Sequence, residues 1–349
     1  MISTDTDTNK PALDRKPYIR HHPTIGYEYV PNTELTLPAP GGGNYTIRIN
    51  SDGIRSNRRY EEAKPSGTFR ILVFGDSFAA GQYVNNEKRF SELLERRIPN
   101  LEVINFGLEG TGTDQQLLIY EEIRNTYEHD LVILLPFLQN IRRNMVESRE
   151  GFDPESSAPI LIPKPRFKLI NNELRLQNVP VPKERKKKTS RKFIANTDTS
   201  RNRLGGFKNR LSNLSETLRI KRLVYTLMGG WEPFPEYRSA DTEAWLLMSA
   251  ILTRFADATN GKPLVIVPVF YNSYVSYRMA TNYLDRFQSL DDGTQVRVID
   301  MLPDFKKLGE DSRYCFQVPH DCHFSVQGHL TISQILENHL SELALLPDS

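Results

Sequence analysis

Runs of consecutive apolar residues recur along two parts of the chain and predict buried strands. The runs are RILVF at 70–74, LEVIN at 101–105, DLVILLPF at 130–137, PLVIVPVF at 263–270 and VRVID at 296–300. Strands that helices cover on both faces read as continuous apolar runs, not as an alternation of apolar and polar positions. The pattern therefore predicts five strands of a parallel sheet.

Apolar residues recur at helical spacing between these runs. The predicted helices cover 86–98, 114–126, 241–258, 278–288 and 325–343, with Asn86 and Ser325 as candidate N-caps of the first and the last. Strands that alternate with helices imply right-handed crossovers and helices on both faces of the sheet. We therefore predict an α/β fold, a three-layer α/β/α sandwich around a five-stranded parallel sheet.

The alternation is absent from three other segments. Residues 1–22 are polar and are predicted to be disordered, whereas 23–66 hold short β-like pieces and form a β-rich lead-in. Residues 146–239 are proline-rich and then basic, apart from a predicted hairpin at 167–177. Compact domains seldom contain plain loops of that length, so we interpret 146–239 as a partly disordered insertion. The domain itself is predicted to consist of 67–145 and 240–349.

Charge is concentrated in one segment of the 349-residue chain. The formal net charge is +2, yet residues 183–222 hold 14 Lys or Arg against 3 Asp or Glu, so the rest of the chain is net acidic. Such a segment is typical of a solvated loop. We expect no nucleic-acid partner, because aromatic residues are not interleaved with the basic ones. Binding of an anionic partner to this segment stays open as an alternative.

The ends and the cysteines bear on the compartment. The N-terminus is polar and acidic, unlike a signal peptide, and no apolar run approaches the ~20 residues of a membrane span. We therefore expect a cytoplasmic protein without a membrane-spanning segment. Cys315 and Cys322 are expected to be unpaired thiols, with a disulfide between them as the alternative.

Candidate chemistry follows the strands. Ligands of such sheets bind beyond the carboxyl ends of the strands. Ser77 follows the first predicted strand, a glycine-rich turn with Gly107 and Gly110 follows the second, and Asn140 follows the third. Asp321 and His323 come just before the last helix. We expect these side chains to meet at one rim of the sheet.

This set of residues matches the needs of acyl transfer. A serine hydroxyl needs an imidazole to take its proton, and the imidazole needs a carboxylate to fix its tautomer. The oxygen of the tetrahedral intermediate needs donors that are already in place, such as backbone N–H groups and an asparagine amide. Ser77, His323 and Asp321 are therefore the candidate catalytic residues.

Two stretches resemble blocks of the SGNH/GDSL hydrolase superfamily. The sequence from Phe74 to Phe78, FGDSF, resembles the first block, in which the serine is the nucleophile. The sequence from Val103 to Gly110 resembles the second block, which implies that Gly110 is an oxyanion-hole residue. Gly107 takes that role in the alternative register.

The other two blocks depart from the family pattern. The third normally reads Gly-x-Asn-Asp, and here Asn140 is kept while the glycine and the following aspartate are absent, with Asn144 as an alternative. In the last block the acid usually stands three residues before the histidine, where this chain has His320. Asp321 stands two before His323, which is similar to SGNH-like acyltransferases that act on polysaccharides.

The resemblance implies a flavodoxin-like three-layer fold and a serine esterase. We expect an acyl-enzyme mechanism on O-acyl groups, acetyl above all, of a carbohydrate or similar small ester, with an oxyanion hole of Ser77, Gly110 and Asn140. The alternatives are an O-acyltransferase to a glycan with the same residues and a non-catalytic glycan- or anion-binding module. We expect no cofactor and no metal, because the histidines and Asp321 match no ligand spacing and a serine mechanism needs no metal.

Overall fold

Five parallel strands form the central sheet of the protein, in the spatial order β14-β13-β7-β5-β6. The structure is a computed structural model that describes residues 18–152, 158–184, 186–187 and 231–347. Each strand of the sheet overlaps one of the apolar runs, so the predicted five-stranded parallel sheet is confirmed. The strands are β5 (Phe69–Gly75), β6 (Leu101–Asn105), β7 (Leu131–Leu135), β13 (Leu264–Ile266) and β14 (Val296–Val298).

The chain extends the sheet from β5 in two directions. It adds β6 on one side of β5, and it then adds β7, β13 and β14 on the other. The order of the strands therefore reverses between β5 and β7, where Gly75 and Leu135 are register partners at the carboxyl ends. Crevices at such a reversal are where open α/β sheets bind ligands.

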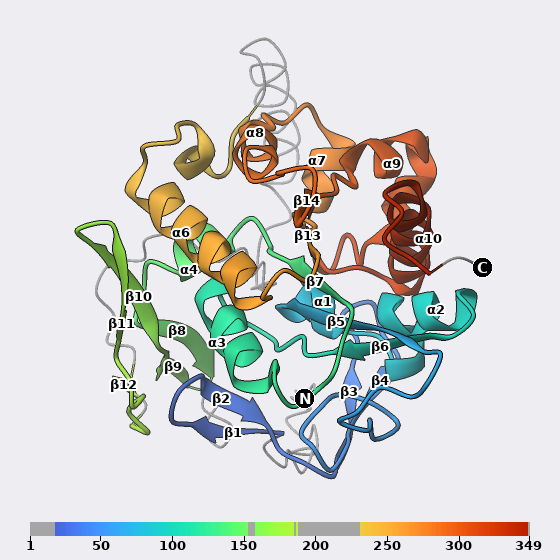
Figure 1. The fold of residues 1–349 in the computed structure, drawn as a ribbon, viewed down its shortest axis with the longest axis horizontal. Helices are drawn as coiled ribbons and strands as arrows, with labels where there is room; N and C mark the ends of the chain where they lie inside the picture. The colour runs from blue at the N-terminus through green and yellow to red at the C-terminus, as the bar shows by residue number, and fades with distance from the viewer. Residues whose placement is uncertain (1–17, 153–157, 185, 188–230, 348–349) are drawn as a thin grey trace, which may run out of the picture.

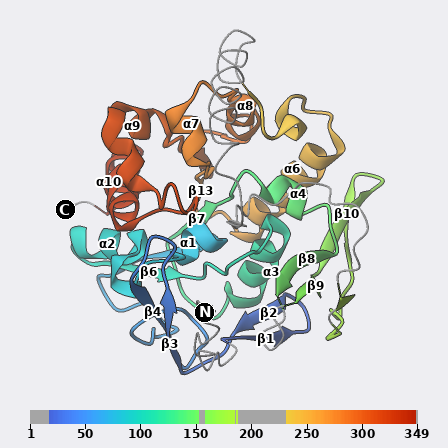
Figure 2. The same ribbon diagram turned by 180° about the vertical axis from the view of Figure 1, so that it is seen from behind.

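Helices cover both faces of the sheet. Helix α3 (Thr113–Ile123) packs with α6 (Glu243–Ala258) on one face, and α2 (Phe90–Arg97) packs with α10 (Val326–Glu342) on the other (Figures 1 and 2). The predicted helix at 278–288 is the shorter α8 (Asn282–Gln288). The remaining short helices are α1 (Ser77–Ala80), η1 (Asn86–Lys88), α4 (Asn140–Arg143), η2 (Pro235–Tyr237), α7 (Asn272–Ser276), α9 (Leu302–Lys307) and η3 (Gly309–Cys315).

One predicted N-cap is correct and the other is wrong. The side chain of Ser325 caps α10 by accepting from the backbone N–H of Gly328 at 3.1 Å. Asn86 caps no helix, because α2 begins only at Phe90 and Asn86 lies in the 3₁₀ turn η1. Its amide oxygen instead accepts from the Nε of Arg55 at 2.9 Å. The side chain of Asn86 therefore makes a contact with a residue 31 positions away in sequence, and not the local helix cap that the sequence indicated.

The lead-in consists of two hairpins. Strands β1 (Ile19–His22) and β2 (Gly26–Tyr29) form the first, and β3 (Thr33–Pro38) and β4 (Asn44–Ile49) form the second. Residues 19–22 were predicted to be disordered, but their backbone pairs with β2, and the ring of Tyr18 stacks on Tyr29 with centroids 6.2 Å apart. The first 17 residues lie outside the described part of the chain.

The described part of the insertion is more regular than the sequence indicated. The predicted hairpin is present as β10 (Arg166–Ile170) and β11 (Glu173–Gln177), joined by Asn171 and Asn172, both at positive φ. A three-stranded sheet was not predicted, because prolines at both ends of its central strand suggested irregular chain. Its strands are β8 (Ser148–Phe152), β9 (Pro159–Pro163) and β12 (Lys186–Lys187). Most of the basic segment 183–222 lies outside the described residues.

Candidate active site

The sharp turn after β5 presents Ser77. The carboxylate of Asp76 caps the one-turn helix α1 by accepting from the backbone N–H of Phe78 at 3.0 Å. Gly81 ends the helix at φ +73 and donates its N–H to the carbonyl of Ser77. Ser77 is 5% exposed, and its own N–H is the first amide of the helix, which has no partner within a helix.

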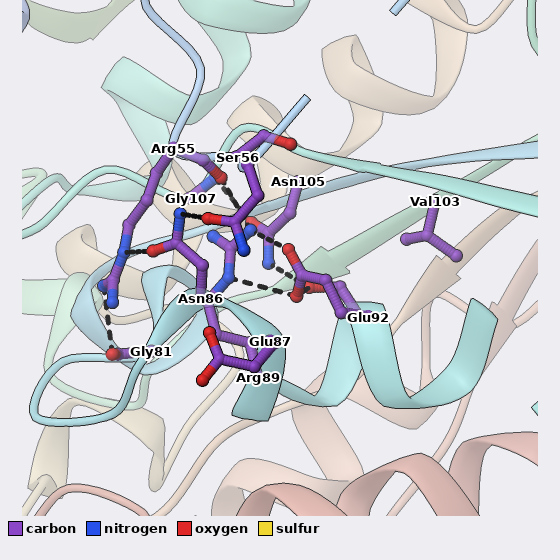
Figure 3. A network of polar contacts seen from close by, with 12 residues as sticks. Arg55, Ser56, Gly81, Asn86, Glu87, Arg89, Glu92, Val103, Asn105 and Gly107 are labelled. Carbon is purple, nitrogen blue, oxygen red and sulfur yellow. Dashed lines mark hydrogen bonds and ion pairs between the residues drawn. The ribbon is translucent and has the colours of Figure 1, made fainter. Parts of the chain in front are cut away.

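A buried arginine from the lead-in holds this turn from behind. Arg55 is 1% exposed and donates to the backbone carbonyls of Ala80 at 2.7 Å, Gly81 at 3.0 Å and Val84 at 2.5 Å. Figure 3 shows its guanidinium between Gly81 and Asn86. The carbonyls at the end of α1 therefore have partners that the helix itself cannot supply.

The loop after β6 packs closely against α1. The amide of Asn105 donates to the carbonyl of Ala79 and to the hydroxyl of Ser91, both at 2.8 Å, and its oxygen accepts the N–H of Gly107 at 2.8 Å. Asn105 and Gly107 are labelled in Figure 3. A Cβ on Gly107 would lie 2.5 Å from the nitrogen of Ala80. Gly107 thus serves close packing and its N–H is already used, so the geometry does not favour it as the oxyanion donor.

Gly110 is placed differently. Its φ of +77 is a conformation that favours glycine, and the preceding carbonyl of Glu109 accepts from the hydroxyl of Tyr27 at 2.8 Å. A Cβ at Gly110 would also lie 2.8 Å from a guanidinium nitrogen of Arg149. No hydrogen bond from the N–H of Gly110 is found among the described residues. This N–H therefore fits the expected donor.

Asn140 and its alternative Asn144 are both buried, but their amides differ. In Asn144 the oxygen accepts from the N–H of Asp114 at 3.2 Å and the nitrogen contacts the sulfur of Met248 at 3.0 Å, so both ends pack α4 against α3 and α6. In Asn140 the oxygen accepts from Arg143, whereas the nitrogen has no partner within the described chain. Asn140 therefore holds a buried amide donor that is free for a ligand.

The loop that carries Asp321 and His323 is closed into a hairpin-like turn. Phe316 and Phe324 form an antiparallel bridge, and Gln317 donates its N–H to the carbonyl of His323 at 2.8 Å. The Oδ1 of Asp321 accepts both the backbone N–H of His323, at 3.0 Å, and its ring Nδ1–H. A spacing of two residues thus lets the carboxylate fix the main chain and the ring of His323 together.

The structure brings Ser77, His323 and Asp321 into one hydrogen-bonded series. The Nε2 of His323 lies 2.8 Å from the Oγ of Ser77, while Nδ1 faces Asp321. Phe78 stacks on the imidazole with centroids 4.6 Å apart, and Tyr83 meets it edge-on at 5.5 Å. The imidazole of His323 is thereby held by hydrogen bonds at both ring nitrogens and by aromatic contacts with Phe78 and Tyr83.

The surroundings shift the pKa of both ionisable members. Burial by itself lowers the pKa of His323, but hydrogen bonds to Asp321 and Cys322 outweigh it and hold this pKa above its usual value. Burial raises the pKa of Asp321, but its bonds to His323 and Tyr83 bring the net pKa below the usual value. The arrangement stabilises an imidazolium–carboxylate pair, the state that forms when the histidine takes a proton.

Sequence reasoning missed three side chains of this site. The hydroxyl of Tyr83 donates to Asp321 at 3.3 Å, Arg55 supports α1, and Arg143 contacts Asp76 and Asn140. The partners of these side chains are 25 or more positions away in sequence, except that Arg143 also contacts Asn140, three positions before it. The only signal for Arg143 was its position three residues after Asn140 in a predicted rim loop.

One group of donors could share a metal ion in the part of the chain that the structure describes. It consists of Asp321, Cys322 and His323, whose ligand atoms lie within 4.8 Å of one another, and it shares Asp321 and His323 with the hydrogen-bonded series. Cys315 is buried and Cys322 half-buried, and both are free thiols. None of the described helices is both long and apolar enough to cross a membrane.

Comparisons with known proteins add little beyond this geometry. No family model and no curated protein matches the chain. Similar solved structures include a lipase from a goat rumen metagenome, 13% identical over 78% of this chain and 97% of its own, with a TM-score of 0.42. A lipolytic G-D-S-L family protein from Veillonella parvula is 12% identical, with coverages of 78% and 99% and a TM-score of 0.40.

A family 3 carbohydrate esterase from Clostridium thermocellum is also similar. It is 12% identical over 80% of this chain and 100% of its own, with a TM-score of 0.40. Identities of 12% to 13% with TM-scores of 0.40 to 0.42 carry no argument about activity.

Proposed function

We propose that this protein is a serine-dependent ester hydrolase that acts through an acyl-enzyme. The observation that supports the proposal best is the series from Ser77 through His323 to Asp321, with 2.8 Å between Oγ and Nε2. A serine hydroxyl is a weak nucleophile until a neighbouring imidazole takes its proton. Because Asp321 lies at Nδ1, the neutral ring has its lone pair at Nε2, toward Ser77.

The reaction proceeds in two halves. The Oγ of Ser77 attacks the ester carbonyl carbon while its proton passes to Nε2 of His323, and the carbonyl electron pair moves onto oxygen. The intermediate collapses, the bond to the alcohol oxygen breaks, and the alcohol leaves with the proton from Nε2. Water then attacks the acyl-enzyme with the same base, which releases the acid and restores Ser77.

Three donors are assigned to the oxyanion. They are the N–H of Ser77, the N–H of Gly110 and the side-chain Nδ2 of Asn140. The buried Nδ2, which has no acceptor among the described residues, supports this assignment, since such a donor is available to the developing negative charge. Removing one donor of this kind typically lowers kcat about 10²- to 10³-fold.

The substrate proposed is an O-acyl ester, with acetyl groups of a carbohydrate as the first choice. The support for a carbohydrate is the order Asp321-x-His323-aromatic-Ser325, which is similar to SGNH-like acyltransferases that act on polysaccharides. An O-acyltransferase would use the same first half, with a glycan hydroxyl in place of water. A mixture of protein, 4-nitrophenyl acetate and candidate glycans separates the two, because a transferase yields acetylated glycan without comparable free acetate.

A fluorophosphonate probe tests whether the site reacts at all. We expect the wild type to be labelled and Ser77→Ala not to be labelled. His323→Ala should lower ester turnover by at least about 10³-fold, because the base is lost. The control His320→Ala should stay within about twofold of wild type, since His320 is exposed and outside the hydrogen-bonded series. A wild type that never reacts with the probe would identify a binding module instead.

A further inference from the structure

Arg143 lies where the loops after three neighbouring strands meet. Its NH1 nitrogen donates to the carboxylate of Asp76 at 2.5 Å, the carbonyl of Thr111 at 3.1 Å and the amide oxygen of Asn140 at 3.2 Å. Asp76 follows β5, Thr111 follows β6 and Asn140 follows β7. NH1 carries two hydrogens, so one of them is shared between acceptors. A single guanidinium nitrogen thus joins the loops that hold the proposed nucleophile and oxyanion donors.

This contact decides which way the Asn140 amide faces. The oxygen and nitrogen ends of an asparagine amide have nearly the same shape, so packing alone does not distinguish them. A guanidinium can only donate, so the end that meets Arg143 must be the oxygen. The nitrogen then points away from Arg143, and this buried donor finds no acceptor among the described residues. Leaving a buried donor unpaired is costly unless a ligand uses it.

Helix α4 is the element that makes the contact possible. Asn140 and Arg143 stand three residues apart, at its two ends, so their side chains project to the same side. The residue that follows Asn140 is Ile141, which is fully buried and offers no polar group. Arg143 also lies over the ring of Phe137, with 5.6 Å between its Cζ and the ring centroid. The guanidinium is therefore fixed before any substrate binds.

We propose that Arg143 is a positioning residue that keeps the donor end of the Asn140 amide toward the oxyanion. The inference rests on the function proposed above and concerns the same site. Without Arg143 the amide can turn by half a rotation and place its oxygen where negative charge develops, which would oppose the reaction. Donation to the amide oxygen also polarises the amide and makes Nδ2 a stronger donor. The same nitrogen neutralises the buried carboxylate of Asp76.

Arg142 offers a matched control. It belongs to the same helix, is also ion-paired, and its side chain is 27% exposed against 25% for Arg143. Its ion-pair partner is Glu236, it donates to the carbonyl of Pro233 at 2.8 Å, and it lies over the ring of Phe234. Replacing either arginine removes one charge and one ion pair from α4, but only Arg143 contacts Asn140.

The kinetic test compares Arg143→Met, Arg143→Lys and Arg142→Met on 4-nitrophenyl acetate. An oxyanion donor acts in the transition state, so Arg143→Met should lower kcat about 10²-fold with KM within about threefold. Arg143→Lys should recover part of kcat, because the ammonium can still donate to Oδ1. Arg142→Met should stay within about twofold. Arg143→Met should cost at most about threefold in an Asn140→Ala background. An equal loss in both backgrounds, or no loss, would overturn the inference.

A second readout does not depend on activity. In ¹⁵N-labelled protein, the side-chain amide signals of Asn140, identified by their loss in Asn140→Asp, should shift or broaden in Arg143→Met and not in Arg142→Met. Unchanged signals in Arg143→Met would also overturn the inference. A wild type that hydrolyses no ester would refute the proposed function, while the amide signals would still show whether Arg143 fixes Asn140. Arg143→Lys serves in both tests if Arg143→Met fails to fold.

Discussion

At the scale of single residues, the spacing between Asp321 and His323 has a local explanation. One carboxylate oxygen accepts the backbone N–H and the ring N–H of the residue two positions on. This is an Asx-type turn, which short acidic side chains favour. The acid therefore needs only one residue, and not the usual two, between itself and the histidine, provided that the turn is closed, as it is by Gln317.

The shifted pKa of His323 predicts an alkaline activity profile. Only the neutral imidazole can take the proton of Ser77, and the bonds to Asp321 and Cys322 keep the pKa above its usual value of about 6.5. The rate of fluorophosphonate labelling should therefore rise with pH, with its midpoint above 6.5. Asp321→Asn removes the carboxylate that favours the charged ring, so the midpoint should move to lower pH and the plateau should fall. A midpoint that stays in place would contradict this account of the shift.

Much of the candidate site could be predicted from residue types and their order. Ser77, Asn140 and His323 stand directly after strands or before the last helix, where the fold class alone places them at one rim. Arg55 could not be predicted, because its partners at the end of α1 and just after it lie 25 or more positions away in sequence and are backbone carbonyls. Every residue has a backbone carbonyl, so the sequence does not mark which carbonyls need a partner or which side chain supplies the donor.

At the scale of elements, α1 depends on the lead-in. A helix of four residues leaves most of its carbonyls without helical partners, and buried carbonyls without partners are costly. Arg55 supplies the donors for three carbonyls at the end of this turn. The lead-in is thus part of the support of the nucleophile, although the predicted boundary at residue 66 would place it outside the domain.

Replacing Arg55 should therefore affect stability and reactivity together. Arg55→Met leaves several buried carbonyls unpaired, and we expect a loss of about 3 kcal/mol in the free energy of unfolding. Labelling of Ser77 should also slow, since its turn loses a support. Arg59→Met is the control, because Arg59 is 72% exposed and pairs with Asp52 at the surface, which predicts a change within about 0.5 kcal/mol. Urea unfolding measures both, and equal losses would refute the role of Arg55.

Helices and strands could be predicted where burial determines which positions are apolar. Continuous apolar runs identified all five strands of the sheet, because both faces of that sheet are covered. The short strands of the insertion were not predicted, because β8 and β9 are held by their pairing with each other and by a buried ion pair between Lys164 and Asp114, not by a continuous apolar run. That ion pair joins positions 50 residues apart, and no periodicity marks it.

At the scale of the whole molecule, the two helices behind the nucleophile are joined by a buried histidine. His329 of α10 is 1% exposed, and its Nδ1 accepts the backbone N–H of Phe90, the first residue of α2, at 3.3 Å. An accepting Nδ1 requires the neutral ring. Burial, followed by the charges of Arg89 and Arg55, lowers the pKa of His329 to about 3.

This histidine predicts how stability depends on pH. In the unfolded chain its pKa returns to about 6.5, so below that pH the unfolded state binds a proton that the folded state does not bind until about pH 3. Stability should therefore fall as pH decreases through this window, by up to about 1.4 kcal/mol per unit. His329→Gln can still accept from Phe90 but cannot titrate, so between pH 7 and pH 5 it should lose about 2 kcal/mol less than wild type in urea unfolding. His323 titrates in both proteins and cancels in this difference. In His320→Gln the free energy of unfolding should change with pH as in wild type, because His320 is exposed. If the pH dependence of His329→Gln is parallel to that of wild type, His329 is not the buried neutral base that joins α10 to α2.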